Sequence, residues 1–166
     1  MDIVTFEVDT PDGPMEVYRA KPDDEARGAV IVVQEAFGVN DHIMDVTRRV
    51  ADAGYLAVAP HIFHRAGGGT APYDDFSKVI PLFAGLDDDK LLDDIDATLD
   101  ALSKQGFPPE HIGIVGFCMG GRVVFLVAAR RQLGAAVGFY GGGIVTARFP
   151  QFPPLVGEAA TLKTPW

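Results

Sequence analysis

The pattern of hydrophobic and polar positions changes character along the chain. Val4, Phe6 and Val8 alternate with polar residues, as in a strand that buries one face. A turn sequence at residues 10–13 and a second alternating stretch at residues 15–20 predict an N-terminal β-hairpin. Four later runs are short and almost wholly apolar, which is typical of strands covered on both faces of a parallel sheet. They span residues 29–33, 55–59, 112–115 and 135–140.

Three segments between these runs have helical periodicity. Asp41 is placed to cap the first helix and Gly54 to end it. The other two predicted helices span residues 87–104, which are amphipathic, and residues 120–133, which are largely apolar. Because strands and helices alternate after the hairpin, we predict an α/β fold with a mostly parallel sheet flanked by helices, forming a single domain over residues 1–166.

Two segments lack clear periodicity. Residues 61–85 contain three consecutive glycines and two prolines, so we expect this segment to leave the sheet and to form part of a cover over the substrate. Residues 162–166, at the end of the chain, are interpreted as the approach to a further strand.

Composition and charge narrow the class of protein. The chain has 166 residues, of which 48% are hydrophobic and 22% charged, as is typical of a globular domain. Its net charge of −9 disfavours nucleic acids and anionic membranes as partners. Seven aspartates crowd residues 87–100 with no histidine or cysteine among them. We interpret them as the solvated face of a helix rather than as a metal site.

The first residues lack a basic and apolar leader, and no run approaches about 20 apolar residues. We therefore expect a soluble, cytoplasmic protein. The chain has one cysteine, Cys118, which excludes an intrachain disulfide. Cys118 is then either a small buried apolar residue or a reactive group.

The sharpest chemical signal is the segment GFCMGG at residues 116–121, between a β-branched strand and an apolar helix. It has the G-x-nucleophile-x-G pattern of a nucleophile elbow, with cysteine in place of serine. Glycines are needed on both sides because side chains there would collide with neighbouring backbone. The turn places Cys118 at a helix N-terminus, whose dipole favours a thiolate or a developing oxyanion. We predict Cys118 as the nucleophile and the Met119 N–H as an oxyanion donor; a buried cysteine in a glycine-rich turn is the alternative.

A second candidate segment, QEAFG at residues 34–38, follows the first buried run. It lies at the carboxyl edge of the predicted sheet, where open α/β sheets bind ligands. The carboxylate of Glu35 is placed to hydrogen-bond the thiol, and the Ala36 N–H to act as a second oxyanion donor. An ordinary exposed glutamate in a loop is the alternative.

Residues at the end of the next strand reach the same edge. His61, His64 and Arg65 are candidates for a substrate contact or a base there, and loop-capping roles are the alternative for each. The candidate substrate-binding residues are Phe37, His64 and Arg65.

These motifs resemble the dienelactone hydrolase family. The matching stretches occur in the family's order and span residues 34–40, 59–65, 116–121 and 136–141. The resemblance implies the α/β-hydrolase fold and a Cys-His-Asp triad. It also implies that Glu35 cradles the resting thiol and that the Ala36 and Met119 N–H groups form the oxyanion hole. The implied reaction is hydrolysis of a small carboxylic ester or lactone through a thioester, which needs no metal or organic cofactor.

Two features depart from the family pattern. The 48 residues after Cys118 contain no histidine and no aspartate, so the acid, the histidine and the last strands of the fold are missing. Without an imidazole, neither the thiol nor a deacylating water has its general base, and we predict impaired turnover. Residues 66–90 contain no arginine, which argues against a dienelactone as the substrate.

The missing strands have a second consequence. Residues 135–140 would form an exposed sheet edge, which predicts self-association. Two other functions fit the same sequence: a non-catalytic protein that binds a small molecule or a partner, and a reactive-cysteine sensor that is alkylated or oxidised without ester chemistry.

Overall fold

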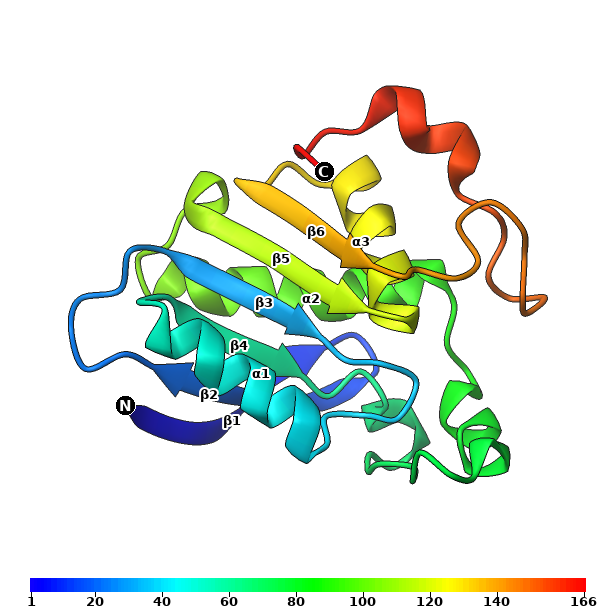
Figure 1. Ribbon diagram of the computed structural model, residues 1–166, viewed down its shortest axis with the longest axis horizontal. Coiled ribbons are helices and arrows are strands. Elements are labelled where there is room, and N and C mark those ends of the chain that lie inside the picture. The colour runs from blue at the N-terminus through cyan, green and yellow to red at the C-terminus, as the bar shows by residue number, and fades with distance from the viewer.

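The computed structural model describes residues 1–166 as one six-stranded sheet with helices on both faces (Figure 1). The strands are β1 (Asp2–Thr10), β2 (Gly13–Lys21), β3 (Ala29–Val33), β4 (Leu56–Pro60), β5 (Ile112–Phe117) and β6 (Ala135–Phe139). The α-helices are α1 (Asp41–Asp52), α2 (Asp88–Lys104) and α3 (Met119–Arg130). Short 3₁₀ helices are η1 (His64–Ala66), η2 (Phe76–Lys78), η3 (Ile80–Phe83), η4 (Pro109–His111) and η5 (Val156–Thr161).

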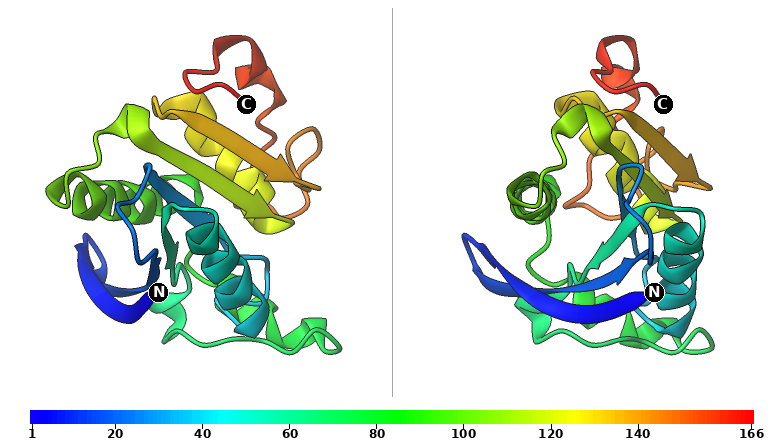
Figure 2. Two further views of the ribbon diagram at one scale, coloured as in Figure 1. Left: turned by 60° about the vertical axis from the view of Figure 1, so that its left-hand side comes forward. Right: turned by 90° about the vertical axis from the view of Figure 1, so that its left-hand side faces the viewer.

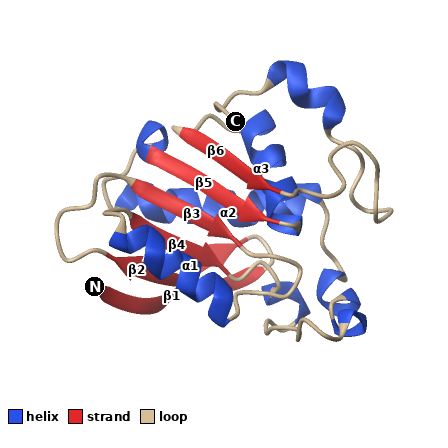
Figure 3. Cartoon of the chain, viewed as in Figure 1, coloured by secondary structure: helices blue, strands red, loops and turns tan.

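The sheet has the strand order β1-β2-β4-β3-β5-β6. The hairpin strands β1 and β2 are antiparallel, and β2 also pairs antiparallel with β4, whereas β4, β3, β5 and β6 are parallel to one another. The predicted α/β fold is therefore confirmed, as a mixed sheet. Figure 3 shows how the carboxyl ends of the parallel strands meet at one edge, where long loops leave the sheet.

Helices cover the two faces unequally. Helices α2 and α3 pack on one face, over a core cluster of 31 buried hydrophobic residues, and α1 packs on the other face, over a smaller cluster around Val32 and Ile43. Figure 2 shows α1 and α2 on opposite sides of the sheet. No helix is both long enough and apolar enough to cross a membrane.

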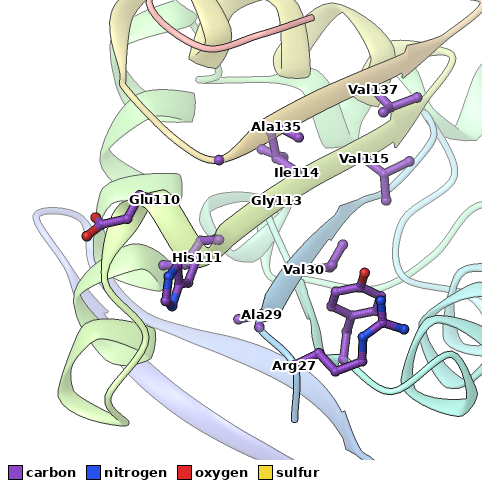
Figure 4. Close-up of a pocket in the computed structure, with 14 residues that line it drawn as sticks. Arg27, Ala29, Val30, Glu110, His111, Gly113, Ile114, Val115, Ala135 and Val137 are labelled. Atoms are coloured by element: carbon purple, nitrogen blue, oxygen red, sulfur yellow. The ribbon is translucent and has the colours of Figure 1, made fainter.

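One part of the sheet has no helix over it. On the α1 face, β5 and β6 leave Val137 and Phe139 about half exposed, at 48% and 47%. A hollow of about 410 Å³ runs along β3, β5 and β6 on this side, with Val30, Val115 and Val137 among its walls (Figure 4). Cys118 does not line this hollow, which also includes residues of the loops before the three strands.

Local details differ from the sequence-based expectations at two places. Asn40, and not Asp41, caps α1: its side-chain oxygen accepts a hydrogen bond from the Ile43 N–H at 3.1 Å. Residues 162–166 form no strand. Instead, the Thr164 hydroxyl accepts a hydrogen bond from the Leu133 N–H, and the Pro165 carbonyl accepts one from the Ala136 N–H of β6.

The aspartates of α2 are the clearest correction. The interpretation of the whole run as a solvated face is wrong for Asp88 and Asp94, which are buried. Asp88 forms an ion pair with Arg122 on α3 at 2.6 Å, and Asp94 forms one with Arg65 at 2.7 Å. Buried carboxylates need such partners. The partners are far away in the sequence, so periodicity alone did not reveal them.

Candidate active site

Cys118 occupies a strained turn between β5 and α3. Its backbone has φ 54° and ψ −116°, so φ lies in the region that non-glycine residues rarely adopt. Two hydrogen bonds hold this turn: the Cys118 N–H donates to the Phe139 carbonyl, and the Cys118 carbonyl accepts from the Gly121 N–H, both at 3.0 Å. Strain of this kind persists only where the surroundings enforce it, and it is concentrated at functional sites.

The glycines around Cys118 are required by close packing. A Cβ atom on Gly120 would lie 2.5 Å from the carbonyl oxygens of both Val33 and Gln34, and one on Gly116 would collide with the Gly120 carbonyl. A Cβ on Gly121 would lie 2.6 Å from the Phe139 carbonyl oxygen. The prediction that side chains at the flanking glycines would strike backbone is therefore confirmed.

Two residues with unpaired backbone N–H groups line the same cavity as Cys118. Ala36 and Met119 line a cavity of about 110 Å³ together with Cys118. The Ala36 N–H makes no hydrogen bond in the structure. Met119 is the first residue of α3, so its N–H has no acceptor within the helix. The N–H groups of Ala36 and Met119 therefore have no hydrogen-bond acceptor within the protein.

The Glu35 carboxylate is held by two tyrosines. It accepts hydrogen bonds from the Tyr73 hydroxyl at 2.8 Å and from the Tyr140 hydroxyl at 3.2 Å, and Asn40 in turn donates to the Tyr73 oxygen. Desolvation and the nearby Glu35 charge raise the pKa of Tyr140, so its hydroxyl keeps its proton as a donor. No hydrogen bond joins Glu35 to Cys118, unlike the resting contact that the family resemblance implies.

Sequence reasoning missed both tyrosines. Tyr73 lies in the irregular segment 61–85, and Tyr140 lies directly after β6 with a φ of 41°. The position of Tyr140 at the carboxyl end of a parallel strand was an available signal, whereas nothing local distinguishes Tyr73. Tyr73 and the cavity-lining Phe76 show that segment 61–85 does cover this edge of the sheet.

The candidate substrate-binding residues divide between two places. The Phe37 ring packs against Tyr73, with 4.4 Å between the ring centroids, and so lies beside the Glu35 network. His64 and Arg65 both bind the buried Asp94, and Arg65 also binds Asp12. Neither lines the Cys118 cavity. Their side chains instead contact α2 and the hairpin turn, so the prediction that they bind substrate at this cavity is wrong.

No histidine lines the Cys118 cavity. His61 is half-buried, and this desolvation lowers its pKa; its backbone N–H donates a hydrogen bond to the Glu16 carbonyl of β2. Two arginines do reach the cavity. Asp88 neutralises Arg122 through both carboxylate oxygens, whereas Arg148 has no ion-pair or hydrogen-bond partner.

A strained strand-to-helix turn at the carboxyl edge of a parallel sheet, with glycines packed against backbone on both sides, has the geometry of the nucleophile elbow of α/β hydrolases. The sequence matches the dienelactone hydrolase family over residues 15–165, and the chain belongs to that family.

Individual relatives agree with this assignment. A Salmonella typhi protein named "Putative carboxymethylenebutenolidase" is 40% identical over 161 residues, which cover 93% of this chain and 57% of that protein. A Pseudomonas putida carboxymethylenebutenolidase is 34% identical over 119 residues, covering 69% of this chain and 50% of the relative. The chain therefore spans about half the length of these relatives.

A solved structure extends the comparison to three dimensions. The crystal structure of a "Putative Dienelactone Hydrolase" from Klebsiella pneumoniae superposes with a TM-score of 0.84 at 36% identity. The match covers 99% of this chain and 71% of that one.

Proposed function

We propose that the chain carries out thiol-dependent acyl transfer from a small carboxylic ester or lactone. The observation that carries this proposal is the placement of Cys118 in a strained turn, in one cavity with Ala36 and Met119, whose N–H groups are the proposed oxyanion donors. The names of the relatives support a substrate of this class.

The chemistry follows from these positions. The Cys118 sulfur attacks the carbonyl carbon, and the oxygen that becomes negative receives hydrogen bonds from the two N–H groups. The alcohol or enol oxygen leaves and takes up a proton, so that the acyl group remains on sulfur as a thioester. Water then releases the acid and restores the thiol. Tyr73 and Tyr140 are proposed to fix Glu35, which modulates the thiol, beside this turn.

Deacylation is the weak step of this chain. Because no imidazole lines the cavity, water that attacks the thioester has no histidine to accept its proton. We therefore propose that the 166-residue chain forms the acyl-enzyme and releases it slowly.

The test is a burst experiment with p-nitrophenyl acetate. We expect Cys118-dependent release of about one equivalent of p-nitrophenol, followed by slow turnover, and an intact mass increased by one acetyl group. The Cys118→Ala variant is the control. Equal release from both proteins would show that Cys118 is no nucleophile. Rapid alkylation of Cys118 without any ester reaction would favour the sensor function instead.

Self-association is a separate expectation for the edge strand β6. At the outer edge of β6, the Ala136 N–H donates a hydrogen bond to the Pro165 carbonyl. The side chains of Val137 and Phe139 remain about half exposed. We expect light scattering at micromolar concentration to detect dimers or larger species, and Val137→Lys to weaken them because a charge at an edge opposes strand pairing. A monomer at these concentrations would contradict the prediction.

A further inference from the structure

The cavity beside Cys118 is small and mainly apolar, although Arg122 and Arg148 also line it. Its volume is about 110 Å³, below the roughly 150 Å³ of an apolar cavity that accepts benzene. A methylene group needs about as much room as a water molecule in the liquid, roughly 30 Å³, so the cavity has space for about four carbon atoms. Phe83, Phe149 and Phe152 form part of its wall.

A second hollow adjoins this wall. It has a volume of about 540 Å³, and Ile80, Leu86 and Gln151 contribute to its lining. Phe83 and Phe149 line both hollows. These two rings therefore lie between the cavity at Cys118 and a larger, mainly apolar groove at the surface.

The two rings differ in how firmly they are held. Phe83 is only 4% exposed, belongs to η3, and packs against Phe63 as well as against the other rings. Phe149 is half-buried and lies in the irregular stretch between β6 and η5. Its edge-to-face contacts with Phe83, at 5.2 Å, and with Phe152, at 6.4 Å, hold the ring across the boundary.

We propose that Phe149 is a specificity-determining residue that limits the acyl group on Cys118 to about four carbons. The inference rests on the proposed acyl transfer at Cys118. An acyl chain bound to the thiol extends into the small cavity and stops at the Phe149 ring. Removal of this ring joins the cavity to the groove, where a longer apolar chain contacts the side chains of Ile80 and Leu86.

The test compares acylation rate constants for p-nitrophenyl butanoate and p-nitrophenyl octanoate on the whole 166-residue chain. Each methylene moved from water into an apolar site favours binding about fourfold. If two of the four additional methylenes enter the groove, Phe149→Ala raises the octanoate-to-butanoate ratio by at least tenfold. Phe149→Leu should give a smaller increase in the same direction.

Phe107→Ala is the matched control, because Phe107 is also a half-buried phenylalanine in a loop but does not line either hollow. The octanoate-to-butanoate ratio of Phe107→Ala should stay within twofold of the ratio for the parent chain. Acetate is measured with every protein, since an acetyl group fits with or without the ring. If Phe149→Ala loses its acetate burst, the octanoate-to-butanoate ratio of Phe149→Leu tests the proposal in its place.

The two proposals fail in different ways. Absence of a Cys118-dependent acetate burst in the parent chain would refute acyl transfer itself. A normal acetate burst, together with a chain-length ratio that neither Phe149 variant changes, would refute the role of Phe149 and leave acyl transfer standing.

Discussion

Gly120→Ala is expected to destabilise the chain by about 3 kcal/mol or more and to slow acylation of Cys118 at least about 100-fold. The new methyl group would lie 2.5 Å from two carbonyl oxygens, those of Val33 and Gln34. Both obstacles are backbone atoms of β3 and its following loop, so no side chain can rotate away. The turn must therefore shift relative to Ala36, which moves the thiol away from one of the two proposed oxyanion donors.

Gly157→Ala provides the matched control. No atom lies within 4 Å of the added Cβ, and Gly157 has no positive φ. This substitution should be neutral or stabilise the chain by up to about 1 kcal/mol. Urea unfolding and the acetate burst give the two readouts for both variants. A Gly120→Ala protein with parental stability and burst rate would show that the elbow does not depend on this contact.

The elbow could be predicted from the sequence because its requirements are local. Residues 116–121 carry the nucleophile and the glycines, and the preceding strand and following helix are each recognisable from periodicity. The same applies to the hairpin and the parallel strands, whose ends were predicted to within about two residues.

Contacts between distant segments could not be predicted in this way. Glu35 meets Tyr140 across 105 positions of the sequence, and Asp88 meets Arg122 across 34. The packing of segments 61–85 and 144–155 against each other creates part of the wall of the Cys118 cavity, and neither segment has a periodic pattern. His64 and Arg65 were predicted to contact the substrate because they follow a strand that ends at the sheet edge. Instead, both side chains bind the buried carboxylate of Asp94 on α2.

The second large expected effect is a loss of stability when the buried ion pair between Asp94 and Arg65 is broken. Asp94 is fully buried and accepts hydrogen bonds from Arg65 at 2.7 Å and His64 at 3.1 Å. Burial raises the pKa of Asp94, and the two basic partners oppose this rise. Arg65 also reaches Asp12 in the β1–β2 turn, so one guanidinium joins the hairpin, η1 and α2.

Asp94→Ala is expected to lower the free energy of unfolding by about 3–5 kcal/mol, because it leaves the Arg65 charge buried without its main partner. The midpoint of urea unfolding, compared at a similar slope, measures this loss. Asp100→Ala is the control on the exposed side of the same helix, with an expected change within about 0.5 kcal/mol. The double variant Asp94→Leu, Arg65→Met removes both charges and should recover much of the stability. If Asp94→Ala unfolds at the same urea concentration as Asp100→Ala, the cluster does not hold α2 to the hairpin.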